Sequence, residues 1–270
     1  MSLAHLGPVM LVGAGKMGLA LARGWLDAGL RPSHLVLVDP SPGPEARQLA
    51  LDYGLVLNSD ASGLLPNVLV LAVKPQIIDK VMESLRPIVG PHTMAISIAA
   101  GIDIARLSRG LDMGRVIRTM PNTPAQVGKG ITGAVAGSDI GPKDRETAEA
   151  LLRAAGPVVW FDDETQLDAV TAVSGSGPAY VFHLVEALAA AGRKLGLPDA
   201  VAEQLARQTV IGSAALLEAD PASPATLRQN VTSPNGTTAA GLTVLMEGLT
   251  PLIERTTEAA RKRSEELGRG

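Results

Sequence analysis

The sequence contains no cysteine. This absence excludes disulfides, thiolate metal sites and thiol nucleophiles. Aromatic residues are scarce, with two each of tryptophan, tyrosine and phenylalanine, so few rings are available to stack on single-stranded nucleic acid. Positive charge is not in excess either, because the formal net charge is -3. We therefore expect no nucleic-acid partner.

Long apolar runs are missing as well. Glycine, serine and proline interrupt the most apolar stretches, for example Val173–Ala179, and such stretches are poor membrane spans. Residues 1–8 lack the charged and apolar regions of a signal peptide. The four histidines show no metal-ligand spacing. We expect a cytoplasmic protein that binds neither a membrane nor a metal.

The first part of the sequence alternates short apolar runs with amphipathic stretches. Hydrophobic residues make up 46% of 270 residues, which suffices for one large core or two ordinary ones. The alternation predicts an α/β fold with a Rossmann-type, doubly wound parallel sheet. The predicted strands are Val9–Val12, Leu35–Val38, Val68–Val73, Met94–Ile98, Val116–Thr119, Val158–Phe161 and one within Gly128–Ala136, and the predicted helices are Lys16–Ala28, Glu45–Asp52 and Lys143–Ala155.

The second part predicts helices alone. Ala179–Leu195 is apolar on nearly every face, so this helix must be buried in a large core or between subunits. Further helices are expected at Pro198–Glu218, Ala239–Glu247 and Thr250–Leu267. We predict a dinucleotide-binding domain at residues 1–164 and an all-helical dimerisation domain at 165–270. The alternative is a monomer whose helices pack on its own sheet.

A glycine-rich loop follows the first predicted strand. Its residues Gly13, Ala14, Gly15, Lys16, Met17 and Gly18 fit the pattern G-x-G-x-x-G. The pattern alone is weak, but here it lies between a strand and a helix, where it binds the pyrophosphate of a dinucleotide. The first glycine permits the turn, the second permits close approach of the phosphates, and the third permits helix–strand packing.

An acidic residue, Asp39, ends the second predicted strand. A carboxylate at this place accepts hydrogen bonds from the adenosine ribose and repels a 2′-phosphate, so it favours NADH over NADPH. The alternative is that Asp39 only caps a turn in Pro40–Pro44.

Lys74 follows another strand and is predicted either to meet the cofactor or to be an ordinary surface lysine. Ile98–Gly101 offers small residues where a nicotinamide ring needs room.

Polar loops in the second half are candidate substrate sites. Asn230–Thr238 combines hydroxyl side chains with a turn before a helix, an arrangement that suits a carboxylate, and Thr238 is placed to donate to a reacting nitrogen. A capped turn is the alternative. Ser174–Pro178 precedes the long apolar helix, and Ser174 or Ser176 is predicted to cap it rather than to bind an anion. Met120–Pro124 forms a rigid polar loop suited to orienting substrate or carboxamide.

At these segments the sequence resembles the pyrroline-5-carboxylate reductases. The similarity extends from about Val9 to Leu267, and its most specific parts are Ala72–Pro75, Met120–Pro124, Asp168–Tyr180 and Asn230–Thr238. The resemblance implies reduction of 1-pyrroline-5-carboxylate to L-proline with NADPH or NADH, the last step of proline biosynthesis. It also implies a homodimer, and sometimes a higher oligomer, built from the C-terminal helices.

The resemblance assigns individual residues. Along the cofactor it implies Val12, Gly13, Ala14, Gly15, Lys16 and Met17 at the pyrophosphate, Asp39 and Pro40 at the ribose, Ala72, Lys74 and Ala100 at the nicotinamide, and Asn230 as a further contact. For the substrate it implies Glu164, Thr237 and Thr238, with Ser233 and Gly236 in the carboxylate-binding turn.

Three positions depart from the family pattern. Asn235 stands where many members have a second glycine, Ala61 where some have an asparagine near the ribose, and Asp39 where several have a small or basic residue. The last departure puts the usual NADPH preference in doubt.

Two other functions remain open. A β-hydroxyacid dehydrogenase would usually need a lysine on the long helix, which has only Lys194 near its end, and a non-catalytic regulator would not need the hydroxyl-rich turn.

Overall fold

The computed structural model describes residues 3–269. The chain forms two compact units. We call Met1–Ser176 together with Ala260–Gly270 the sheet unit, and Gly177–Ala259 the helical unit. Residues 165–176 and 260–270, which the expected division at 164/165 assigns to the helical domain, therefore belong to the sheet unit.

The sheet unit is built on one sheet of eight strands in the order β3-β2-β1-β4-β5-β6-β7-β8. Neighbouring strands are parallel except β6 and β7, which are antiparallel. The prediction of a doubly wound α/β sheet is confirmed; the expected parallel arrangement holds for β1 to β6, whereas β7 and β8 run in the opposite direction. The strands are β1 (Val9–Val12), β2 (Leu35–Val38), β3 (Val56–Asn58), β4 (Val68–Leu71), β5 (Met94–Ser97), β6 (Val116–Met120), β7 (Thr132–Ala136) and β8 (Val158–Phe161).

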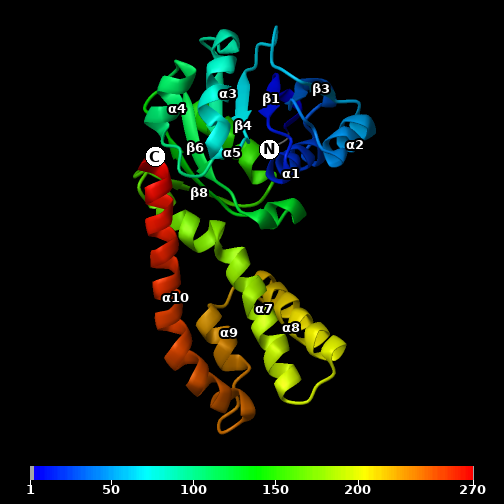
Figure 1. Ribbon diagram of the computed structural model, residues 1–270, viewed down its shortest axis with the longest axis vertical. Coiled ribbons are helices and arrows are strands. Elements are labelled where there is room, and N and C mark those ends of the chain that lie inside the picture. The colour runs from blue at the N-terminus through cyan, green and yellow to red at the C-terminus, as the bar shows by residue number, and fades with distance from the viewer. Residues whose placement is uncertain (1–2, 270) are drawn as a thin grey trace. The chain divides into compact units, whose positions relative to one another are not determined.

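Helices cover both faces of this sheet (Figure 1). Val9 and Leu11 of β1 belong to one hydrophobic core, and Met10 and Val12 belong to the other, because successive side chains of a strand point to opposite faces. The first core includes residues of α1 (Lys16–Asp27), α2 (Pro44–Tyr53) and α5 (Pro142–Arg153), and the second includes residues of α3 (Ile78–Leu85) and α4 (Ile104–Leu111).

Short helical turns complete the connections of the sheet unit. The 3-10 turns are Leu3–His5, Pro32–His34, Pro75–Ile77, Arg86–Ile88 and Thr123–Val127. After β8 the chain forms α6 (Gln166–Val170), which continues as a π-helix at Thr171–Gly175. The expectation that Ser174 or Ser176 caps the next helix is wrong. The Ser174 hydroxyl donates to the Val170 carbonyl, and Ser176 has helical rather than extended dihedrals, so the helical path is not interrupted.

The helical unit contains α7 (Gly177–Lys194), α8 (Asp199–Ala219), α9 (Pro224–Asn230) and the first part of α10 (Thr237–Arg269). A short connection with Gly196 at φ +94° joins α7 to α8, and the two helices pack side by side (Figure 1). The two helices expected at 239–247 and 250–267 form one helix, α10, which includes Pro251. Proline removes a single backbone donor, and the helix continues on both sides of it. Asn230 and Thr237, expected in a loop, belong to α9 and α10.

Candidate active site

The glycine-rich loop, residues 13–18, connects β1 to α1. Gly13 has φ +99°, and a Cβ there would lie 2.6 Å from the Ala72 carbonyl oxygen. A Cβ on Gly18 would lie 2.3 Å from the Gly13 carbonyl oxygen, so neighbouring backbone requires glycine at both positions. Gly15, at the N-cap of α1, instead faces open space. The loop thus leaves room beside the first N–H groups of a helix, where a phosphate is stabilised.

Asp39 lies beside this loop. Its Oδ2 accepts a hydrogen bond of 2.8 Å from the Ala14 N–H, and its Oδ1 accepts one of 2.8 Å from the Ser41 N–H. The second bond is the turn cap considered from the sequence, and the first connects the end of β2 to the glycine loop. One carboxylate therefore shapes both the loop and the turn, and it brings a negative charge next to the candidate pyrophosphate site.

A cavity of about 560 Å³ opens beside the ends of β1 and β2. It lies at the carboxyl ends of these strands, where doubly wound folds bind nucleotides. Asp60 is its one lining carboxylate, and the Ser62 N–H lowers the pKa of Asp60 by donating to it. Lysine and arginine are missing from the lining, and Ala61 forms part of the wall. The lining residues are Val12, Val38, Pro40, Ser59, Asp60, Ala61, Ser62, Gly63, Leu64, Leu65, Val81, Ser84, Leu85, Pro87 and Ile88.

The candidate nicotinamide side follows β4 and β5. Ala72 directly borders the glycine loop. Its carbonyl oxygen lies where a Cβ on Gly13 would clash, and its own Cβ would lie 3.4 Å from a Cβ built on Gly18. Lys74 is exposed and precedes the turn Pro75–Ile77. Ala100 is half-buried in the connection between β5 and α4. The structure therefore brings Ala72 next to the candidate pyrophosphate site and leaves Lys74 at the surface.

One carboxylate oxygen of Glu164 already accepts two hydrogen bonds from other residues of the chain. Its Oε1 accepts hydrogen bonds of 2.8 Å from the Ile104 N–H and 2.9 Å from Arg118 Nη1. The Arg118 side chain is 9% exposed, whereas that of Glu164 is 30% exposed. The second carboxylate oxygen, Oε2, is the atom of Glu164 that remains for a ligand.

The hydroxyl-rich turn lies in the helical unit, between α9 and α10. The Gly236 N–H donates to the Ser233 carbonyl over 3.0 Å, and Asn235 has φ +57°. Asparagine therefore adopts the left-handed conformation that the family pattern assigns to a glycine, at little steric cost. Thr237 and Thr238 form the first turn of α10, whose N–H groups have no helical acceptors. The turn places two hydroxyls and free backbone donors together, which suits a carboxylate.

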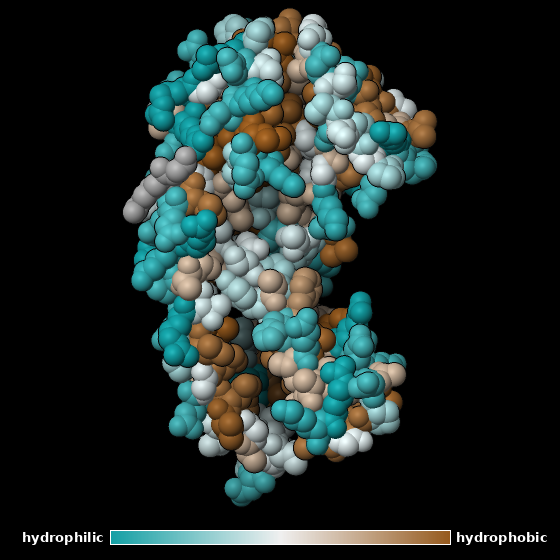
Figure 2. Space-filling view, viewed as in Figure 1, coloured by the Kyte–Doolittle hydropathy of each residue, from teal (hydrophilic) through white to brown (hydrophobic). Residues whose placement is uncertain are grey.

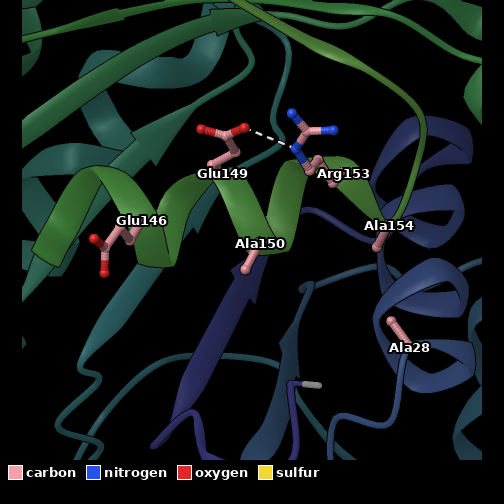
Figure 3. Close-up of a pocket in the computed structure, with 6 residues that line it drawn as sticks. All are labelled: Ala28, Glu146, Glu149, Ala150, Arg153 and Ala154. Carbon is pink, nitrogen blue, oxygen red and sulfur yellow. Dashed lines mark hydrogen bonds and ion pairs between the residues drawn. The ribbon is translucent and has the colours of Figure 1, made fainter. Parts of the chain in front are cut away.

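Another depression, of about 480 Å³, lies between α1 and α5 (Figure 3). Ala28 borders it at the C-terminal end of α1, about 18 Å along the helix from the glycine loop. Glu149 and Arg153 on its rim form an ion pair of 2.7 Å, and Arg153 lowers the pKa of Glu149. Because this depression lies between two helices and away from the glycine-rich loop, it is not the candidate site.

Comparison with known proteins agrees with this arrangement. Residues 8–101 match the family described as NADP oxidoreductase, coenzyme F420-dependent. Residues 164–267 match the pyrroline-5-carboxylate reductase dimerisation family. A pyrroline-5-carboxylate reductase of Pseudomonas aeruginosa is 41% identical over 265 residues, which cover 96% of each chain. The chain belongs to the pyrroline-5-carboxylate reductase family.

Solved structures of the family share the fold. The reductase of Coxiella burnetii is 34% identical, with a TM-score of 0.90 over 97% of this chain and 99% of that one. The reductase of Plasmodium falciparum, solved with NADP bound, is 29% identical, with a TM-score of 0.82 over 98% of each chain. The predicted resemblance and fold class are confirmed. The chain is an NAD(P)-dependent oxidoreductase, which rules against the non-catalytic alternative.

The helical unit of this pyrroline-5-carboxylate reductase family member exposes much apolar surface (Figure 2). In α7, Ala189 alone is buried. Phe182 is 65% exposed and Val244 is 74% exposed. Single apolar side chains are common on protein surfaces, but contiguous apolar faces mark interaction sites. Together with the match to a dimerisation family, this surface identifies the helical unit as an oligomerisation element.

Among residues 3–269, none of the helices combines the length and hydropathy needed to cross a bilayer. In the same range, histidine and acidic side chains form no cluster of three or more suited to a metal ion.

The sequence analysis missed one group of interacting residues. Arg118, Asp168 and Ser264 are buried or nearly so and lie close together in the sheet unit. The available signal was a single arginine inside the apolar strand Val116–Met120, because a buried cation requires a partner. The partners lie far along the chain, so the sequence did not indicate which they are.

Proposed function

We propose that the chain reduces 1-pyrroline-5-carboxylate to L-proline, the last step of proline biosynthesis, with a reduced nicotinamide dinucleotide. The observation that carries the proposal is 41% identity to a pyrroline-5-carboxylate reductase over nearly the whole of both chains. A β-hydroxyacid dehydrogenase has no comparable support. The test is loss of cofactor absorbance when purified protein is mixed with NADH or NADPH and 1-pyrroline-5-carboxylate. Formation of proline must match cofactor oxidation, and no substrate-dependent loss would refute the proposal.

The proposed cofactor site runs along the strand ends of the sheet unit. Residues 12–18 hold the pyrophosphate, Asp39 and Pro40 border the ribose, and Ala72, Lys74 and Ala100 border the nicotinamide, with Asn230 as a further contact. The open space at Gly15 and the cavity beside Pro40 fit a dinucleotide and its adenosine, respectively. A bound reduced nicotinamide supplies the hydride.

The proposed substrate cradle is the turn at residues 233–238. Ser233, Gly236 and Thr237 hold the carboxylate through hydroxyl and backbone N–H groups, and the N-terminal end of α10 adds a favourable dipole. In a homodimer, Thr238 of one protomer donates a hydrogen bond to the ring nitrogen as the nitrogen lone pair forms during hydride addition, and Glu164 of the other protomer approaches the amino acid through Oε2.

The chemistry requires little acid–base machinery. A protonated cyclic imine is already electrophilic, so hydride addition forms the carbon–hydrogen bond while the carbon–nitrogen π electrons move to the ring nitrogen. The product amine keeps the proton that the imine nitrogen already carried. The residues of this chain therefore act by orientation, and positioning can lower a barrier by roughly 7–11 kcal/mol at best.

NADH is the proposed preferred cofactor. The Asp39 carboxylate lies beside the glycine loop, and the neighbouring cavity is lined by one further carboxylate and no cation. Arg47, the first basic residue after Asp39, donates its Nε–H to the Pro42 carbonyl. A 2′-phosphate would meet negative charge without a compensating cation. Comparing kcat/KM for NADH and NADPH tests this preference, and a higher value for NADPH would contradict it.

The proposed assembly is a homodimer formed through the helical unit. Its support is the exposed apolar surface of α7, α8 and α10 (Figure 2), and sedimentation velocity tests it. We also propose a cytoplasmic location, which cell fractionation tests.

A further inference from the structure

The last turns of α10 belong to the sheet unit, where Ser264 joins them to α6. Ser264 is 5% exposed, and its hydroxyl donates to Asp168 Oδ1 over 2.6 Å. The same Oδ1 lies 4.0 Å from Arg118 Nη2. Because an ionised acceptor strengthens a hydrogen bond, this contact holds the end of α10 against α6.

Arg118 connects this contact to the middle of the sheet. It lies on β6, which pairs with β5, and its Nη1 donates to Glu164 Oε1. Glu164 in turn accepts from the Ile104 N–H at the start of α4. We call Arg118, Asp168 and Ser264 the arginine anchor. It fixes the end of α10 to the sheet, and through Glu164 it also reaches the beginning of α4.

The connection between β5 and α4 lies directly against the end of α10. We call residues 98–101 the nicotinamide loop, because Ala100 is proposed to border the nicotinamide. Gly101 has φ +75°, and a Cβ there would lie 3.3 Å from the Gly268 nitrogen. A Cβ on Gly268 would lie 3.1 Å from the Gly101 carbonyl oxygen. The two backbones therefore pack closely, and a side chain at either glycine would fit only if its neighbour shifted.

From these contacts we propose that the last turn of α10 positions the nicotinamide loop for hydride transfer, and that Arg118, Asp168 and Ser264 are its positioning residues. Ser264 and Gly268 lie one turn apart on the same helix, so the anchor determines how closely Gly268 approaches Gly101. The inference rests on the proposed function.

Two variants test the inference from different directions. Ser264→Ala removes the hydroxyl that holds α10 to Asp168, and Gly268→Ala leaves that bond but pushes on the Gly101 carbonyl. Matched controls are Ser138→Ala, which removes an exposed hydroxyl that also donates to a carboxylate, and Gly90→Ala, whose new Cβ would meet nothing closer than 3.9 Å.

The first readout requires neither cofactor nor turnover. Hydrogen–deuterium exchange of the peptide covering residues 98–104 should be faster in Ser264→Ala and Gly268→Ala than in wild type, and unchanged in both controls. Unchanged exchange in both test variants would overturn the inference.

The second readout separates positioning from folding. We expect kcat to fall about tenfold in each test variant, since small misplacements of reacting groups are costly. The dissociation constant of NADH should change less than about twofold, and the primary isotope effect with 4-deuterated NADH should increase, because the chemical step becomes slower. A lower kcat with an unchanged isotope effect would indicate only loss of folded enzyme and would overturn the inference. A wild-type protein that does not reduce 1-pyrroline-5-carboxylate would refute the proposed function instead, and the exchange readout would still decide whether α10 holds the loop.

Discussion

At the scale of single residues, Thr238 is the side chain proposed to contact the reacting nitrogen. It lies in the first turn of α10, next to the N–H groups that have no helical acceptor. Thr238→Ala should lower kcat about 10- to 100-fold, because the nitrogen lone pair that forms as the hydride arrives would lack its donor, and an unsatisfied buried acceptor costs roughly 1–3 kcal/mol. The dissociation constant of NADH, measured by fluorescence, should stay unchanged. Thr238→Ser should restore most of the rate, and a fully active alanine variant would contradict the role.

Asp39 is the residue that we expect to set the preference between NADH and NADPH. Asp39→Asn keeps one oxygen acceptor for the Ala14 or Ser41 N–H but removes the charge. The ratio of kcat/KM for NADPH to that for NADH should rise about tenfold, because repulsion between two charges near a protein surface reaches a few kcal/mol before screening. Asp52→Asn, on the exposed end of α2, is the control and should leave the ratio unchanged. An unchanged ratio in Asp39→Asn would show that this carboxylate only shapes the loop.

At the scale of the turns and helices, we expect Asn235 to set the geometry of the proposed carboxylate cradle. Its φ of +57° costs an ordinary residue about 1–2 kcal/mol. Asn235→Gly should leave the KM for 1-pyrroline-5-carboxylate nearly unchanged, whereas Asn235→Ala should raise it severalfold as the turn opens. Steady-state kinetics on the pair check this expectation, and equal KM values would show that the turn is held by other contacts.

Glu149 joins α5 to β8 and makes the stability of the fold depend on pH. It pairs with Arg153 and accepts from Trp160 Nε1 over 3.2 Å, and these contacts lower the pKa of Glu149. The stabilisation is complete above the pKa of the unfolded chain, about 4.3, and is lost as the pH falls through the lower folded pKa. Glu149→Gln should therefore reduce stability at pH 7 more than at pH 3, by less than about 1 kcal/mol for this partly exposed pair. Unfolding followed by tryptophan fluorescence measures it, with Glu146→Gln as the control.

The helices and strands differ in how well the sequence predicts them. Apolar strands between helices were predictable because burial on both faces leaves an unbroken hydrophobic run. The edge strand Val56–Asn58 is short and partly exposed, so it left no such pattern. Both α3 and α4 have eight residues, too few for a clear period. A break was expected in α10 at residues 248–249, just before Pro251, but the helix tolerates the donor that this proline lacks.

The residues of the cofactor loop were recognisable because a local pattern carries them. The arginine anchor was not, because Asp168 and Ser264 are 96 positions apart, and Arg118 is likewise 46 positions from its other partner, Glu164. Nothing local distinguishes Ser264 from any other serine near a helix end. Only the folded chain shows that its hydroxyl is buried against a carboxylate.

At the scale of the whole molecule, the composition of α7 requires explanation. The helix was predicted to be buried on all sides, yet within this chain it is almost entirely exposed. A fully exposed apolar helix would be costly in water, since burial contributes about 25 cal/mol per Å². The proposed homodimer would resolve this, because a second copy covering α7 would complete the core of the helical unit.

If a second copy covers this apolar surface, a charge placed on it should weaken dimerisation. Phe182→Glu and Val244→Glu each place a carboxylate on the apolar surface of the helical unit, where both side chains are more than half exposed in the single chain. Burying an unpaired charge costs several kcal/mol, so each variant should weaken dimerisation by about 100-fold or more. Sedimentation velocity over a range of concentrations measures the change. Leu51→Glu is the matched control, because Leu51 is 78% exposed on α2 of the sheet unit and lies outside the apolar surface. If both variants sediment as wild type does, these side chains lie outside the subunit contact. If they become monomeric and lose activity while the control keeps both properties, the apolar character of α7 and α10 exists to build the oligomer in which the active site is complete.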